Sequence, residues 1–94
     1  MNNSQNIKFL LTRISYAEDE KAFKQFFDLF AGRLYQFACS FLRNKSTAEE
    51  VVSDVFFKVW LNRKSLTDID NIKAYLFKAT YNTVLNYIDE ENRK

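Results

Sequence analysis

Proline is missing from this chain of 94 residues, and Gly32 is its only glycine. These two residue types build most of the tight turns that join neighbouring β-strands, so their near absence argues against hairpins, sandwiches and barrels. The chain is also short enough for one small domain at most. With 47% apolar and 28% charged residues, it falls in the range of folded globular proteins. These properties predict a single all-α domain over residues 1–94.

Apolar residues recur every three or four positions in long segments, as expected for helices that bury one face. The first long segment predicts a helix from about Asp19 to Leu42, with acidic residues at its N-terminus, where the helix dipole favours negative charge. Its apolar stripe consists of Phe23, Phe26, Phe27, Phe30, Leu34, Phe37, Ala38 and Phe41. A shorter helix, joined to it around Ser15 and Tyr16, is predicted by the apolar residues Ile7, Leu10, Leu11 and Ile14.

Two more helices are predicted towards the C-terminus. The sequence Ser46–Glu49 matches a capping box, in which serine and glutamate side chains satisfy free backbone amides, so a helix is expected from there to about residue 64. The stretch Ser65–Asp70 has no apolar period and predicts a connecting loop, with Asp68 or Asp70 as the next cap. A last helix is expected over about Asn71–Asp89. The fold class is therefore a compact bundle of three long helices plus a short N-terminal helix.

Residue counts exclude several kinds of chemistry. The chain has no histidine and one cysteine, Cys39, so it cannot form His/Cys zinc sites, Ser-His-Asp triads or disulfides on its own. Cys39 lies in an apolar stretch and is expected in the core. No glycine-rich loop is present to hold a phosphate. We expect no enzymatic activity, no metal and no cofactor.

The sequence shows neither a strong charge imbalance nor a recognisable targeting segment. The N-terminal segment lacks a basic stretch followed by a long apolar run, so we expect neither a signal peptide nor a membrane span, and a cytoplasmic protein. Fourteen basic and twelve acidic residues give a net charge of +2, without a dense basic block. Since proteins that hold duplex DNA by themselves usually carry such a block, only weak autonomous binding of nucleic acid is expected.

The predicted third helix carries two unusual surface features. Glu49, Glu50 and Asp54 form a carboxylate cluster, which suits a metal ion but is more often a solvated face or a partner contact. Phe57 falls by helical phase near the edge of the polar face, where a large apolar residue has little cover.

The last helix has a polar side that combines lysines, amides and aromatic residues. Its polar members are Lys73, Lys78, Asn82 and Asn86, and the aromatic residues beside them are Phe77 and Tyr75, the latter on the apolar stripe by phase. Such a set is most often an ordinary helix surface. It also suits single-stranded nucleic acid, because lysines contact phosphates, asparagines pair with base edges and aromatic rings stack on unpaired bases.

Two motifs carry a family resemblance. Residues 48–60, AEEVVSDVFFKVW, and residues 74–83, AYLFKATYNT, resemble region 2 of bacterial RNA polymerase sigma factors, in particular the extracytoplasmic-function class. The resemblance extends from about Asp19 to Tyr87 and includes EKAF at residues 20–23. It implies an all-α domain that takes part in transcription initiation and has no catalytic activity of its own.

The resemblance also implies where two partners bind. In this family the second long helix docks on the coiled-coil clamp helices of the largest subunit of core RNA polymerase. The positions that match this contact are Glu50, Ser53, Asp54, Phe57 and Lys58. The loop and the last helix recognise and help melt the minus-ten promoter element, capturing a flipped base of the non-template strand. The positions implied in DNA binding are Ser65, Leu66, Thr67, Asp68, Lys73, Tyr75, Lys78, Asn82 and Asn86.

The chain departs from the family pattern at three places. Ser53 stands where Gln is usual, Tyr75 replaces the more frequent Trp, and Asp89–Glu91 precedes the basic residues expected after the last helix. The family also has a second helical domain with a helix-turn-helix, so we expect this chain to be a fragment of a longer protein. Two other interpretations stay open: a helical module that docks an anti-sigma factor without recognising DNA, and a carboxylate metal enzyme.

Overall fold

The computed structural model describes residues 3–93, with side chains from Asn6 onward, and contains no strand in that range. The elements in chain order are α1 (Asn3–Ala17), α2 (Glu20–Cys39), α3 (Lys45–Leu61), the 3₁₀-helix η1 (Arg63–Asp68) and α4 (Ile72–Asn92). The predicted all-α class, with three long helices preceded by a shorter one, is confirmed.

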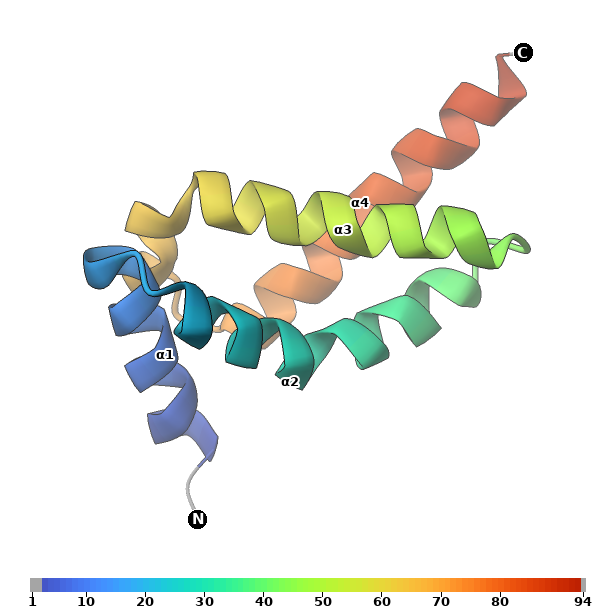
Figure 1. Cartoon of the computed structure of the whole chain (residues 1–94). Coiled ribbons are helices and arrows are strands. Elements are labelled where there is room, and N and C mark those ends of the chain that lie inside the picture. The colour runs from blue at the N-terminus through green and yellow to red at the C-terminus, as the bar shows by residue number, and fades with distance from the viewer. Residues whose placement is uncertain (1–2, 94) are drawn as a thin grey trace.

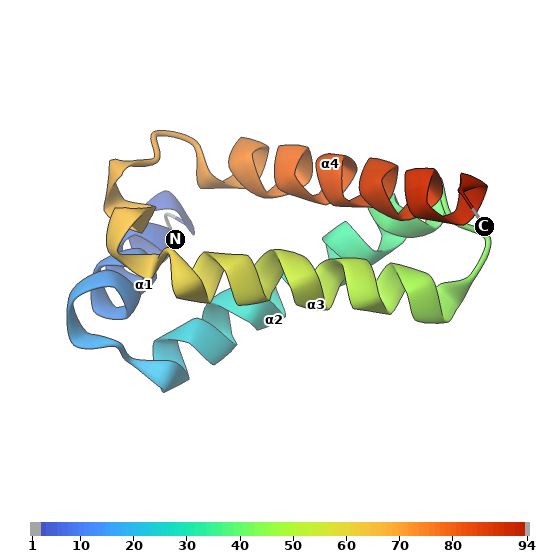
Figure 2. The same ribbon diagram turned by 90° about the horizontal axis from the view of Figure 1, so that it is seen from above.

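The helices form an elongated bundle of 42 × 26 × 22 Å. α2 and α3 lie side by side, and α4 runs back along α3 in the opposite direction (Figure 1, Figure 2). α1 packs against η1 and α2 at the end of the bundle where the chain turns from α3 into α4. Most residues of the apolar stripes that the sequence predicts fill the space between the helices, whereas Phe27 and Phe41 of the first long stripe are exposed.

The core is made of side chains from every helix. Phe26 and Leu34 of α2, Val55 of α3 and Leu76 of α4 are each 1% exposed or less. Burying one such side chain contributes about 1.5–3 kcal/mol to stability. Cys39 is half-buried and packs against a smaller apolar cluster, so it lies at the edge of the core rather than inside it.

α2 begins where the sequence predicts and ends earlier. The carboxylate of Asp19 accepts hydrogen bonds from the backbone amides of Lys21 and Ala22, at 3.0 and 3.1 Å, and so caps the helix. The helix ends at Cys39 instead of Leu42.

Asn44, and not Ser46, caps α3. The side-chain oxygen of Asn44 accepts a hydrogen bond from the backbone amide of Thr47 at 3.2 Å. The helix already starts at Lys45, so Ser46 lies inside the first turn. The predicted capping box is therefore wrong: two capping side chains stand within three positions, and the first of them has the extended backbone that a cap needs.

The predicted loop between the last two long helices is wrong in part. Residues 63–68 form η1, and α3 ends at Leu61 instead of near residue 64. Leu66 is 2% exposed and packs in the main core cluster. This single apolar side chain fixes the turn against the bundle, which explains why the segment is helical and not irregular.

α4 is longer than predicted and has a different cap. The side-chain oxygen of Asn71 accepts from the backbone amide of Ala74 at 3.0 Å, so neither Asp68 nor Asp70 is the cap. The helix continues to Asn92, beyond the predicted end at Asp89.

A polar contact ties the turn between α1 and α2 to η1. Glu18 has a φ of 53°, in the left-handed region that glycine adopts more easily. Its carboxylate accepts a hydrogen bond from the guanidinium of Arg63 at 2.7 Å. The same guanidinium lies over the ring of Trp60, 4.6 Å from its centre. The Glu18–Arg63 contact therefore joins residues 45 positions apart and connects the turn between α1 and α2 to the start of η1.

Candidate partner and nucleic-acid interfaces

The outer face of α3 carries the residues expected at a partner contact. Glu50, Ser53, Phe57 and Lys58 are exposed, and Asp54 is half-buried. The side chain of Phe57 is 63% exposed, as its helical phase predicts. An exposed phenylalanine in the middle of an ordered helix adds little to the core, so its position suits contact with another molecule.

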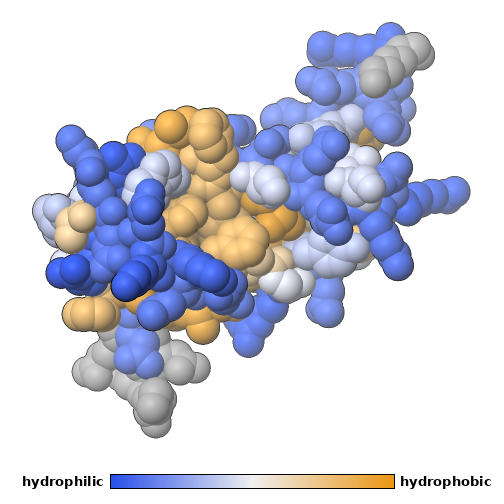
Figure 3. Space-filling model, in the orientation of Figure 1, coloured by the Kyte–Doolittle hydropathy of each residue, from blue (hydrophilic) through white to orange (hydrophobic). Residues whose placement is uncertain are grey.

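An apolar hollow, here called the aromatic groove, lies between α2 and α3 beside Phe57. Its volume is about 440 Å³, and it is lined by Glu20, Phe23, Phe27, Ser53, Phe56, Phe57 and Trp60. Its rings pack edge to face, with 4.8 Å between the ring centres of Phe27 and Phe56. In Figure 3 apolar atoms gather over the middle of this face, where α2 and α3 lie side by side. The groove extends the exposed ring of Phe57 into a larger apolar surface.

Asp54 connects the α3 face to α4. The hydroxyl of Tyr87 donates a hydrogen bond to its carboxylate at 2.5 Å. This hydrogen bond, together with burial of the phenol, raises the pKa of Tyr87 to about 12. The Asp54 carboxylate is therefore held in place by α4 and is less free than the neighbouring Glu50.

The residues expected to contact DNA lie on η1 and α4, and all but one are at the surface. The exposed ones are Ser65, Thr67, Asp68, Lys73, Tyr75, Lys78, Asn82 and Asn86. Leu66 is the exception, because its side chain is buried in the core, where it also lines the hollow between α1, η1 and α4. Tyr75 has the helical phase of a core residue but is 37% exposed, so its ring is accessible.

Phe77 belongs to the packing of the bundle. It is half-buried against the main core, and its ring lies 5.1 Å from that of Phe37, nearly perpendicular to it. The ring that was expected to be free for stacking is therefore partly covered. The physical reason is that α2 covers this flank of α4.

A second hollow lies between α1, η1 and the start of α4. Its volume is about 760 Å³, within the range of small-ligand sites. The residues that line it include Thr67 of η1, Asp70 of the connection that follows, and Lys73 of α4. The opposite wall comes from α1, with Lys8 and Thr12. The sequence did not predict the contribution of α1 to this hollow, because it depends on the packing of α1 against η1, two segments that are far apart in the sequence.

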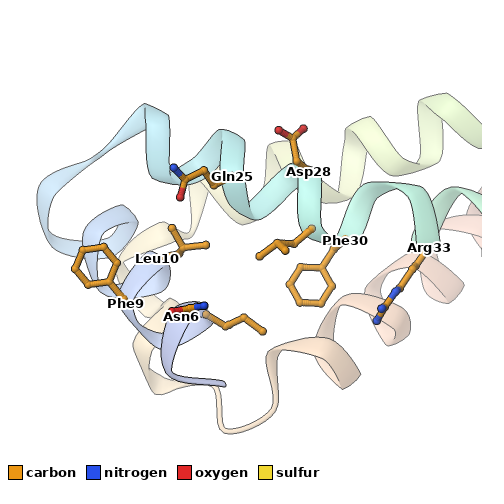
Figure 4. A pocket seen from close by; sticks show the side chains of 9 residues that line it. Asn6, Phe9, Leu10, Gln25, Asp28, Phe30 and Arg33 are labelled. Carbon is orange, nitrogen blue, oxygen red and sulfur yellow. The ribbon is translucent and has the colours of Figure 1, made fainter. Parts of the chain in front are cut away.

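A third hollow separates α1 from α2. It measures about 520 Å³ and has an apolar floor and a polar rim that includes Asn6, Gln25, Asp28 and Arg33 (Figure 4). Phe9 and Leu29, which also line it, are 65% and 51% exposed. These two apolar residues lie off the predicted stripes, which is the sequence feature that could have indicated the hollow.

Two other findings concern the residues that the structure describes. Among them, no three His, Cys, Asp or Glu side chains come together in a way that could hold a metal ion. None of the described helices is both long and apolar enough to cross a membrane.

Comparison with known proteins identifies a family. The family model for sigma-70 region 2 matches residues 26–94, which is most of the chain. Searches of curated proteins and of solved structures found no significant match. The matched segment covers most of α2 together with α3, η1 and α4, and so includes the α3 face, most of the aromatic groove and the η1–α4 surface.

Proposed function

The chain belongs to the sigma-70 region 2 family, and from this premise we propose that it is the polymerase-binding and minus-ten-recognising domain of a sigma factor of the extracytoplasmic-function class. The family itself acts in transcription initiation and promoter recognition, and it is not a family of enzymes. Assignment to the class rests on the motifs at residues 48–60 and 74–83. By analogy with that class, we place the protein in the cytoplasm, joined to a helix-turn-helix domain.

The observation that carries the proposal is the exposure of Phe57 beside the aromatic groove. Protein interfaces commonly place an aromatic anchor at the centre and charged residues around it. Here the anchor is flanked on α3 by Asp54 and Glu50, at one and two turns' distance respectively. A partner helix that carries an apolar face and basic side chains would complement the apolar anchor and the carboxylates beside it. The clamp helices of the largest polymerase subunit are the partner that the family implies.

A pull-down with the polymerase clamp helices tests this interface. Phe57→Ala should abolish capture, because it removes the exposed anchor, and should leave the helical circular dichroism unchanged. Phe9→Ala is the matched control, because Phe9 is similarly exposed, at 65%, but lies on α1. Equal capture of both variants would remove Phe57 from the interface. A competing anti-sigma factor that binds the same groove should lose affinity for Phe57→Ala in parallel.

The η1–α4 surface is the proposed contact with the minus-ten element. The hollow between α1, η1 and α4 is large enough for an extruded base, and Asp70, Asn71 and Lys73 offer hydrogen-bonding groups at its edge. Extrusion of a base costs a few kcal/mol of unstacking, which contacts to the free base must offset. The net charge of +2 agrees with weak binding by the isolated domain and stronger binding on the polymerase.

Binding of a labelled single-stranded minus-ten oligonucleotide tests this second interface. We expect weak, salt-dependent binding with a preference for the promoter sequence over a scrambled strand. Asn82→Ala should remove that preference, because Asn82 is an exposed amide able to pair with a base edge. If the unmodified chain shows no sequence preference even at low ionic strength, the minus-ten contact is contradicted, while the polymerase contact can still hold.

A further inference from the structure

The hollow between α1 and α2 lies apart from the interfaces proposed on α3 and α4. Its floor includes the buried side chains of Leu10 and Phe30, and the exposed side chains of Phe9 and Leu29 line it as well. Its volume of about 520 Å³ falls within the range of small-ligand pockets, which are lined mostly by apolar side chains and a few polar ones. The hollow therefore has the size and the lining of a binding site for a small apolar group.

The polar rim of the hollow carries one positive charge that nothing compensates. The carboxylate of Asp28 points away from the hollow (Figure 4) and accepts a hydrogen bond from the ammonium group of Lys24 at 3.0 Å. Arg33 is exposed and forms no ion pair within residues 6–93. The two other polar side chains of the rim, Asn6 and Gln25, are neutral amides. The rim thus offers a guanidinium, a group that binds carboxylates through two parallel hydrogen bonds.

Gly32 lies next to Arg33 in the middle of α2 and is the only glycine of the chain. Glycine destabilises a helix relative to alanine. Neither the backbone nor the packing requires it here, because its φ is not positive and a Cβ at this position would meet no atom within 4 Å. At 3.6 residues per turn, Gly32 faces the same side of α2 as Asp28 and Leu29. It therefore leaves open space beside Arg33, where a ligand can approach the helix backbone closely.

We propose that this hollow binds a small amphipathic carboxylate, with its aliphatic chain between Phe9 and Leu29 and its carboxylate on Arg33. The apolar lining favours the chain, because binding removes apolar surface of both partners from water. The guanidinium favours an anionic head group, and Gly32 leaves room for it. A bound ligand contacts both helices and so holds α1 against α2. The site lies outside the α3 face and the η1–α4 surface, and it is independent of the proposed function.

The test is a nuclear magnetic resonance titration of the 94-residue chain with octanoate below its micelle-forming concentration. We expect saturable shifts of backbone amide signals in α1 and in α2 around Gly32. Octanol has the same chain length without the charge and should bind about fivefold more weakly, the upper end of the effect of an exposed ion pair. Acetate, which lacks the chain, should not compete with octanoate.

Three variants separate the contributions of charge, chain and space. Arg33→Gln should weaken octanoate binding about fivefold and leave octanol binding unchanged. Its matched control is Arg43→Gln, because Arg43 is also exposed without an ion pair in the described residues but does not line the hollow. Phe9→Ala should weaken binding of both ligands by the same factor, whereas Tyr16→Ala, at an exposed position of α1 outside the hollow, should not.

Gly32→Leu should weaken octanoate binding at least as much as Arg33→Gln, because the new side chain occupies the space beside the guanidinium. Leucine also favours the helix over glycine, so an unchanged or increased helical circular dichroism would show that the loss is not caused by unfolding.

Three outcomes would overturn the proposal. The first is equal affinity of the unmodified chain for octanoate and octanol, and the second is equal octanoate affinity of Arg33→Gln and Arg43→Gln. The third is a dimer of the unliganded chain, seen by sedimentation velocity, that Phe9→Ala dissociates, because a second copy would then be the occupant of the hollow.

Discussion

Tyr87 is the residue through which α4 holds a carboxylate on the outer face of α3. Tyr87→Phe removes the donor to Asp54 and leaves that half-buried carboxylate without its protein partner. We expect a loss of about 1–2 kcal/mol in the free energy of unfolding, measured by urea denaturation. Tyr81→Phe is the control, because its hydroxyl has no partner in the described part of the chain. Equal stabilities would show that the hydrogen bond adds nothing.

The same contact has a pH dependence in the alkaline range. The pKa of Tyr87 is raised from 10.0 to about 12 in the folded chain. A group whose pKa rises on folding stabilises the fold while it is protonated. The contribution of Tyr87 is therefore complete below about pH 10 and is lost as the pH rises through about 12. In an ultraviolet titration, Tyr87→Phe should remove a tyrosine that ionises at about pH 12. The pKa of Tyr35 is also raised, by its hydrogen bond with Cys39, and its ionisation should remain in the variant.

At the scale of single residues, the sequence reliably predicts which side chains are exposed within long helices. It predicts this poorly for residues between the helices. Phe57 is exposed as expected, because the apolar stripe of α3 fixes the helical phase over many residues. Leu66 is buried although it was expected among the DNA contacts, since one apolar residue in a polar stretch has no period from which its direction could be read. Tyr75 and Phe77 sit at stripe edges, where the neighbouring helix decides which ring is covered.

Which residue caps the N-terminus of α3 can be tested directly. Asn44→Ala should cost about 1 kcal/mol of stability, because it removes the cap that the Thr47 amide uses. Ser46→Ala should change stability by only a few tenths of a kcal/mol, because Ser46 lies in the first turn and alanine is the better helix former. Thermal unfolding of the two variants measures both effects. A larger loss in Ser46→Ala would restore the capping box predicted from the sequence.

The helices could be predicted from the sequence, but the residues at which they begin and end could not. The stripes identify all four α-helices because apolar spacing reports the face that each one buries. Caps depend on which of several adjacent polar residues takes an extended backbone, and the sequence around Asn44 and Asn71 offers competing candidates. The short helix η1 has no stripe, and its shape follows from the burial of Leu66.

At the scale of the whole molecule, the packing of α1 against η1 could not be predicted from the sequence. The ion pair between Glu18 and Arg63 joins segments that are distant in the sequence. Because glutamate and arginine each have many other possible partners in the chain, this pairing could not be predicted. It lies at the end of the bundle where α1 packs against η1. The α3 face and the polar flank of α4, in contrast, each lie on one helix, which is why most candidate residues could be named in advance.

Acid should weaken this end of the bundle. The hydrogen bond and charge of Arg63 lower the pKa of Glu18 below its ordinary 4.5. A carboxylate whose pKa falls on folding stabilises the fold above its ordinary pKa, and this contribution is lost as the pH drops through the folded value. Glu18→Gln should therefore reduce the difference between the urea midpoints at about pH 7 and about pH 3. Glu20→Gln, which removes an exposed carboxylate that pairs with no cation in residues 6–93, is the control. Identical pH dependence in the two variants would mean that the Glu18–Arg63 contact does not stabilise the junction of α1 and η1.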